Sequence, residues 1–225
     1  MPAELKQHYV AFLDILGFSD MVHADVMSQE QVHLAKLFGC HQRAGGIFQR
    51  DPECTITQFS DSIVIARPYD PEAFAPFVKG VAEYQRLLLD EELLCRGGIA
   101  VNKHFSNGSF TFSAGVIDAY RLESVHARNP RVVVSLDLLE LLFPKRPIPG
   151  SLLIREDDGL YFVDYLGITG HRRPASLRRV VTRIVAGLLS RSEPSLREKG
   201  IWMAAYADSA LETTLGVPKF EIQKP

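Results

Sequence analysis

The chain has 225 residues and a formal net charge of −2, with 46% hydrophobic and 23% charged residues. Its length and apolar content suffice for one large domain, or for a domain with an appendage, around a real core. The near-neutral charge gives no long-range attraction to nucleic acid or to an anionic membrane. No run of about 18 apolar residues predicts a membrane-spanning helix. The N-terminus lacks the features of a signal peptide, and three widely spaced cysteines are typical of reduced thiols. We therefore expect a cytoplasmic protein that binds neither nucleic acid nor membrane.

The first predicted strand covers residues 8–13, which are apolar and β-rich, and it ends at Asp14. The chain then turns, and residues 28–31 have the composition of a helix start. Helical spacing puts three apolar side chains on one face of that helix: Val32, Ala35 and Phe38.

Two short predicted strands, 55–59 and 63–66, flank Ser60-Asp61-Ser62, so that Asp61 lies at the tip of a tight hairpin. Asp70-Pro71 is a helix-start signal. An amphipathic helix is expected after it, followed by a strand at 96–101.

The second half begins with a turn at Asn107-Gly108 and a helix that Gly115 opens and that runs through Glu123. The remaining predicted elements are a strand at 131–135, a helix at 136–143, a hairpin of strands 151–155 and 160–165, and an amphipathic helix at 177–189. The first part thus has the order strand, helix, strand, strand, helix, strand. This order predicts an α/β (α+β) fold: a ferredoxin-like split β-α-β sheet with helices on one face, extended by a C-terminal hairpin and helices.

Asp14 and Asp61 stand out by their positions in this fold. Their strands are neighbours at the centre of a split β-α-β sheet, so the two carboxylates are expected side by side at one edge. Two close carboxylates repel each other unless a cation lies between them, and hard oxygen ligands suit Mg²⁺ or Mn²⁺. Each residue also has a simpler interpretation, Asp14 as a helix cap and Asp61 as a turn residue.

Four segments in order resemble the class III nucleotide cyclases. Residues 12–19 (FLDILGFS) resemble the first metal motif, and residues 58–62 (QFSDS) resemble the second. Residues 96–99 (RGGI) resemble the strand that follows, and residues 115–123 (GVIDAYRLE) resemble the helix with the transition-state residues. Within that family, the chain is similar to the Pycsar pyrimidine cyclases of bacterial antiphage defence. The similar parts are the compact helix motif, Leu160 to Val163, and Lys199 to Trp202 with Tyr206.

The resemblance implies a site with two divalent cations, Mg²⁺ or Mn²⁺. Its residues would be Asp14, Ile15 and Asp61 at the metals, Arg121 as the transition-state cation, and Ile15, Gly17, Phe18, Thr57 and Arg96 at the nucleotide. Three positions depart from the family pattern. Thr57 replaces a lysine or glutamate that reads a purine, and Ile117 replaces the transition-state asparagine. No lysine for the triphosphate is present near residues 161–165, so Arg121, Arg96, Lys103 and Arg50 are the remaining candidates for that contact.

The resemblance further implies a homodimer with shared active sites that converts a pyrimidine nucleoside triphosphate, UTP rather than CTP, to its 3′,5′-cyclic monophosphate and pyrophosphate. A separate effector would sense the product. Residues 1–170 would form the catalytic domain, and residues 171–225 a helical extension packed on it. Two alternatives stay open: a purine (adenylate or guanylate) cyclase, and an inactive nucleotide-binding sensor of the same fold. The sequence does not decide between UTP and CTP.

Overall fold

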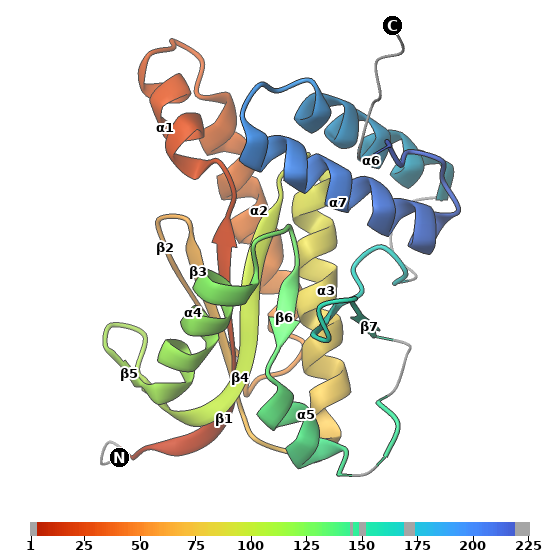
Figure 1. The fold of residues 1–225 in the computed structure, drawn as a ribbon. Coiled ribbons are helices and arrows are strands. Elements are labelled where there is room, and N and C mark those ends of the chain that lie inside the picture. Colours follow the sequence, from red (N-terminus) through yellow and green to blue (C-terminus); the bar gives the residue numbers. More distant parts are fainter. Residues whose placement is uncertain (1–3, 145, 149–151, 169–173, 219–225) are drawn as a thin grey trace, which may run out of the picture. The chain divides into compact units, whose positions relative to one another are not determined.

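The computed structural model describes residues 4–144, 146–148, 152–168 and 174–218 (Figure 1). The chain divides into two compact units, Met1–Ile168 and Thr169–Pro225. The expected boundary after residue 170 lies outside the described residues. That the extension packs on the core stays a prediction, so each unit is described by itself.

The described residues of the larger unit form one sheet and five helices. The elements of this unit are β1 (Lys6–Ile15), α1 (Phe18–Val26), α2 (Val32–Phe48), β2 (Thr55–Phe59), β3 (Ser62–Pro68), a 3₁₀ turn (Pro71–Ala73), α3 (Phe74–Asp90), β4 (Cys95–Ser106), β5 (Thr111–Ser113), α4 (Ala114–His126), β6 (Val132–Val134), α5 (Leu136–Leu142), β7 (Leu153–Arg155) and β8 (Tyr161–Val163). Most bounds are close to the predicted ones, but β5 was not predicted and β4 extends to Ser106, beyond its predicted end at residue 101.

The sheet has eight strands in the order β2-β3-β1-β4-β6-β8-β7, with β5 paired to β4. All pairs are antiparallel except β4 with β6. The strands of the two aspartates are therefore neighbours, as the sequence predicts. The register sets Asp14 opposite Ser62 on β3 and opposite Arg96 on β4. This register brings one end of β1 against the β2–β3 hairpin on one side and Arg96 on the other.

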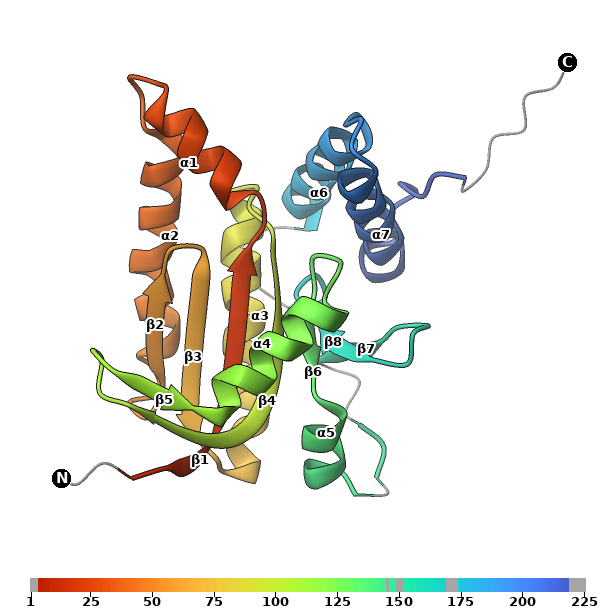
Figure 2. The same cartoon turned by 60° about the vertical axis from the view of Figure 1, so that its left-hand side comes forward.

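The helices of the split β-α-β part, α2 and α3, lie on one face of the sheet, as predicted, and α4, which follows that part in the chain, covers the other face. Figures 1 and 2 show α4 on one side of β1 and β4, and α3 on the other. Side chains alternate along β1. Val10 is part of a buried cluster with Ala119 of α4, whereas the Tyr9 ring packs against Phe74 and Phe77 of α3. A continuous apolar strand is stable only when both of its faces are buried, and Tyr9 and Val10 are both fully buried.

Two glycines allow α4 to approach the sheet closely. A Cβ atom at Gly98 would lie 2.4 Å from the Ala119 carbonyl oxygen and 2.5 Å from the Leu122 Cβ atom. A Cβ atom at Gly115 would lie 2.7 Å from the Val10 side chain. Gly98 weakens the sequence pattern of a strand, but α4 packs closely against β4 because this residue has no side chain.

The predicted apolar face of α2 is exposed rather than buried. Val32 and Phe38 are 48% and 57% exposed, and the residues of α2 that are buried are Cys40, Ala44 and Phe48. The helix begins at Val32, and its first amides donate to a distant side chain, the Asp25 carboxylate, at 3.2 and 2.7 Å. The face that the sequence assigns to the core therefore borders a surface cavity, described below.

The smaller unit contains α6 (Pro174–Leu189) and α7 (Pro194–Leu211). The predicted stripe of α6 is confirmed: Leu177, Val180, Val181 and Val185 are buried. The second helix was not predicted. Across the described residues of both units, every helix is too short or too polar to cross a membrane.

Candidate functional site

Asp14 and Asp61 meet at one end of β1. Asp14 is the last residue but one of the strand, and Asp61 forms the β2–β3 turn with Ser60, which has a positive φ of 57°. The Ile15 amide donates to the Asp61 carbonyl oxygen at 3.1 Å, which ties the hairpin tip to the end of β1. The structure thus brings together the three residues that the sequence assigns to the metals.

An arginine and a second acidic residue complete this cluster. The Arg96 Nε atom lies 3.1 Å from Asp14 Oδ2 and 2.7 Å from Glu123 Oε1. Its N–H donates to Asp14, whereas Glu123 Oε1 accepts no hydrogen bond despite its close approach. Both contacts use the same nitrogen, so the two Nη groups are left to other acceptors.

Glu123 is the residue of this cluster that sequence reasoning missed. It lies on α4 and is only 3% exposed. A signal was present: helical spacing puts Glu123 on the same side of α4 as Ala119, four residues earlier, which faces the sheet. A carboxylate on the buried side of a helix needs a cationic partner, and Arg96 is the cation that the register provides.

Burial and mutual repulsion shape the acidity of the cluster. Burial raises the pKa of Asp14; Arg96 opposes this shift, and the neighbouring Asp61 carboxyl adds to it. Burial likewise raises the pKa of Glu123, against the attraction of Arg96 and together with Asp14 and Asp61. One guanidinium therefore does not neutralise the three carboxylates, and the site retains an excess of negative charge.

The donor set fits a divalent cation of the Mg²⁺ type. Within the described ranges, no three His, Cys, Asp or Glu side chains are arranged to hold a metal ion. Mg²⁺ typically takes one or two carboxylates and completes its shell with substrate phosphates and water. Asp14, Asp61 and the Ile15 backbone beside them offer hard oxygen ligands of this kind, in a site where uncompensated negative charge favours a cation.

The turn after Asp14 is built for close approach of a ligand. Gly17 has φ 75° and precedes α1, and no atom would contact a Cβ there within 4 Å. This left-handed conformation explains the glycine. The first amides of α1, beginning with Phe18, have no partner within the helix, and such amides favour phosphate.

The register places Thr57 on the same sheet face as Asp14. Thr57 is opposite Val64, which is opposite Phe12, two residues before Asp14. Phe59 lies on this face too and is 82% exposed. Because α4 covers β1 and β4, the part of this face formed by β2 stays accessible.

Arg121 is not brought to this cluster within the chain. It is exposed on α4, two residues before the buried Glu123, and residues at this spacing point to different sides of a helix. Ile117, four residues earlier on the same side of the helix, is 53% exposed; Tyr120 is 52% exposed, and its ring also packs edge-on against Phe12 of β1. Of the other candidate cations, Arg50 pairs with Glu83 at 2.8 Å.

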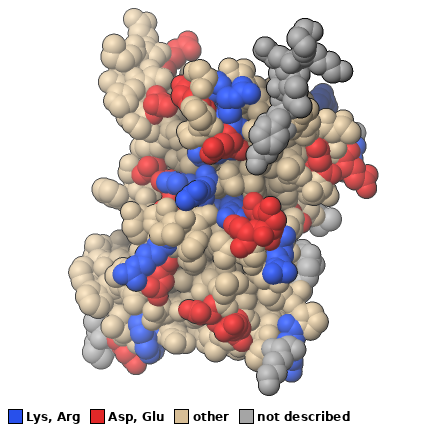
Figure 3. Space-filling view, viewed as in Figure 1, with Lys and Arg blue, Asp and Glu red and all other residues tan. Residues whose placement is uncertain are grey.

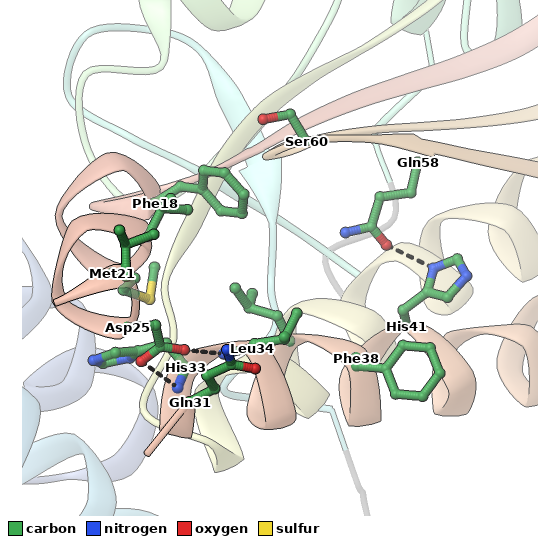
Figure 4. A pocket seen from close by; sticks show the side chains of 13 residues that line it. Phe18, Met21, Asp25, Gln31, His33, Leu34, Phe38, His41, Gln58 and Ser60 are labelled. Atoms are coloured by element: carbon green, nitrogen blue, oxygen red, sulfur yellow. Dashed lines mark hydrogen bonds between the residues drawn. The ribbon is translucent and has the colours of Figure 1, made fainter. Parts of the chain in front are cut away.

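A surface cavity of about 450 Å³ lies between α1, α2 and the β2–β3 hairpin (Figure 4). Apolar side chains line most of it, among them Phe18, Leu34 and Phe38. At one end, Gln58 Oε1 lies 2.6 Å from His41 Nδ1. Gln58 is opposite Ile63 in the register, so the cavity is on the sheet face away from Thr57. No sequence pattern indicated this cavity.

The face of the molecule shown in Figure 3 carries no single strong charge. Figure 3 shows acidic and basic side chains interspersed, with uncharged areas over α1 and the β5 hairpin. The exposed apolar side chains of these areas include Val26 and Met27 after α1, and Phe110 and Phe112 around β5.

Comparisons with known proteins bear on the fold. No protein-family model and no curated protein matches the chain. Among solved structures, the monomeric guanylyl cyclase domain of the RhoGC fusion protein from the aquatic fungus Blastocladiella emersonii matches with a TM-score of 0.55 and 13% identity, over 73% of this chain and 98% of its own. The adenylyl cyclase CyaB from P. aeruginosa matches with a TM-score of 0.50 and 17% identity, over 76% and 98%.

A third match is the catalytic core of a rhodopsin-guanylyl cyclase with converted specificity, in complex with ATPαS, with a TM-score of 0.52 and 16% identity over 72% of this chain and 98% of its own. At these identities the likeness shows the fold alone. The chain has the fold of class III nucleotide cyclase catalytic domains, as the sequence predicts.

Proposed function

We propose that this protein is a nucleotide cyclase. The observation that carries the proposal is the pair Asp14 and Asp61, held side by side at the end of β1 in a cyclase fold with more negative charge than Arg96 neutralises. Divalent cations at such a pair supply activation of the ribose 3′-hydroxyl and stabilisation of the pyrophosphate leaving group.

The residues of the chain would bind and orient the triphosphate around this pair. The amide N–H groups after Gly17 would donate hydrogen bonds to the β- and γ-phosphates at the start of α1. The Nη groups of Arg96, whose Nε contacts Asp14 and Glu123, would donate hydrogen bonds to a phosphate bound beside these carboxylates. The reaction needs a cation on the α-phosphate in the transition state, and Arg121 is our candidate.

Arg121 would serve the site of a second copy. Its exposure on the outer side of α4, among the apolar residues Ile117 and Tyr120, supports a homodimer in which each site takes carboxylates from one subunit and Arg121 from the other. A two-fold axis makes such an exchange reciprocal.

We propose a pyrimidine nucleoside triphosphate as the substrate, UTP before CTP. Thr57 is short, and Phe59 beside it on the open sheet face would narrow the space for a base. A single ring suits that space better than a purine, while a threonine hydroxyl donates or accepts and therefore does not distinguish uracil from cytosine. The product would be cUMP, sensed by a separate effector in antiphage defence.

One observation favours a second candidate, a nucleotide-binding sensor without turnover. Arg96 donates a hydrogen bond to Asp14, one of the proposed metal ligands. In addition, Ile117 replaces the transition-state asparagine of the family that the chain resembles. The sensor would bind a triphosphate without releasing pyrophosphate.

A single assay tests these proposals. The purified protein is incubated with ATP, GTP, CTP and UTP separately, with Mn²⁺, and cyclic product and pyrophosphate are measured. We expect product from UTP above the others. Equal turnover of ATP and UTP contradicts pyrimidine selectivity, and binding without any product supports the sensor.

A further inference from the structure

Glu123 differs from a residue that only anchors a helix, because its acceptor atom is unused. Glu123 Oε1 lies 2.7 Å from Arg96 Nε but accepts no hydrogen bond, since that N–H is directed at Asp14. A buried carboxylate oxygen without a donor is unfavourable. A small rotation of the guanidinium would transfer the N–H from Asp14 to Glu123.

The position of Glu123 is fixed by packing and not by the ion pair. The backbone of α4 lies so close to β4 that a Cβ at Gly98 would collide with Ala119 and Leu122, the residue before Glu123. The Arg96 side chain is less confined, because 32% of it is exposed against 3% of the Glu123 side chain. The helix therefore offers Glu123 as a fixed second acceptor beside a guanidinium that can move.

We propose that Glu123 is a positioning residue for the carboxylate pair: it draws the Arg96 guanidinium off Asp14 when a divalent cation binds there. The inference rests on the proposed function, because it takes Asp14 and Asp61 as the metal ligands. Before the metal binds, Arg96 is the counter-cation of Asp14. Once the metal is present, the positive guanidinium would be repelled, and Glu123 keeps it hydrogen-bonded within the site.

A double-mutant cycle on metal binding tests this role. Mn²⁺ alone is titrated into the full-length protein by calorimetry, with the Mn²⁺-induced rise in melting temperature as a second readout. Glu123→Gln should weaken Mn²⁺ binding by about tenfold, because Arg96 then has Asp14 as its remaining carboxylate. Arg96→Gln should tighten Mn²⁺ binding, because it removes the competing cation. In the Arg96→Gln protein, adding Glu123→Gln should change the Mn²⁺ affinity by less than about twofold.

The matched control is Asp118→Asn. Asp118 is on the same helix and accepts a hydrogen bond from Asn102 at 2.7 Å, so this variant removes the same charge without contact to Arg96. We expect the Mn²⁺ affinity of Asp118→Asn to stay within about twofold of wild type, since solvent and salt screen the charge of Asp118 from the carboxylate pair.

The outcomes separate clearly. The inference is overturned if Glu123→Gln leaves Mn²⁺ affinity unchanged, if it weakens binding equally with Arg or Gln at position 96, or if the wild-type protein binds no Mn²⁺. If Glu123→Gln does not fold, Arg96→Gln decides alone: weaker or unchanged Mn²⁺ binding contradicts the competition. Failure of the proposed function has a different signature, Mn²⁺ binding without cyclic product.

Discussion

Among the arginines that join two carboxylates, Arg131 and Arg96 do so in opposite ways. Arg131 is buried, with 4% of its side chain exposed, and it uses different nitrogens: Nη1 bonds Glu156, while Nη2 bonds Asp158 at 2.6 Å and the His126 carbonyl oxygen at 2.9 Å. Arg96 is partly exposed and presents one nitrogen to Asp14 and Glu123. In the first cluster each carboxylate has its own nitrogen of Arg131, although the buried Nε of that arginine has no hydrogen-bond partner; in the second, one carboxylate oxygen has no donor.

The acidities of the carboxylates reflect the same difference. Burial would raise the pKa of Asp158, but the hydrogen bond from Arg131 holds it below the usual value. At Arg96, the pKa values of Asp14 and Glu123 are raised despite the arginine. The Arg131 cluster stabilises the fold around the β7–β8 hairpin, and the Arg96 cluster keeps unneutralised charge where a cation can bind. A functional site is thus expected at the Arg96 cluster, whose carboxylates are less fully neutralised.

The largest expected effect is on turnover. Asp14→Ala and Asp61→Ala should each reduce cyclic product by at least about a hundredfold, because each removes a ligand of the catalytic cations. Product is measured with Mn²⁺ after circular dichroism has shown a folded protein. Asp158→Ala, from the other cluster, should retain turnover in its folded fraction. Near-normal product from a folded Asp14→Ala variant would refute the metal model.

Stability should show the reverse order. Arg131→Met should lower the free energy of unfolding by about 3 kcal/mol, since it leaves two carboxylates without their buried partner. Arg96→Met should lower the free energy of unfolding by about 1 kcal/mol. The ion pairs of Arg96 are partly exposed and therefore screened by solvent, and their attraction is offset by the burial and mutual repulsion of the carboxylates. Urea titrations measure both values. A larger loss for Arg96→Met would mean that its cluster is primarily structural.

A buried ionisable group without a charged partner offers a third case. His104 is 3% exposed; its Nδ1 lies 2.9 Å from Ser113 Oγ, and its ring lies 5.0 Å from that of His8. Burial, with a smaller contribution from His8, lowers the pKa of His104 to about 4. The unfolded chain therefore binds the proton more strongly, and stability falls as pH drops from about 6.5 through 4.

We expect His104 alone to lower the free energy of unfolding by about 2 kcal/mol at pH 5 relative to pH 7.5. His104→Gln should reduce the pH dependence of the unfolding free energy by that amount, measured by urea titration at both values. His41→Gln, at an exposed histidine, is measured in the same way as the matched control. An equal pH dependence in wild type and His104→Gln contradicts the assignment.

The smallest expected signal is a partial recovery of activity. Inactive Asp14→Ala and Arg121→Ala proteins are unfolded together and refolded so that mixed dimers form. About half of the dimers should be mixed, with one of their two sites intact, so activity should return to about a quarter of wild type. Refolding each variant alone is the control. No recovery, with mixed dimers demonstrated, would mean that Arg121 acts within its own chain or is not catalytic.

The sequence by itself determined the order of the elements in the larger unit and the placement of both aspartates. Asp14 follows an apolar β-rich run and Asp61 lies between two short strands, and these are local signals that depend on neighbouring residues. The topology follows because few arrangements fit such an order. The family resemblance also pointed to Gly17, whose φ of 75° favours a glycine.

The tertiary structure alone decided what lies against these residues. Glu123 meets Arg96 because Gly98 lets α4 approach β4, a contact between residues 27 positions apart in the sequence. The same approach puts α4 on the second sheet face, and it turns Arg121 outward. The exposed apolar face of α2 likewise depends on the hairpin and α1 beside it. Side-chain periodicity gives the faces of an element, but only packing decides which face is covered and by what.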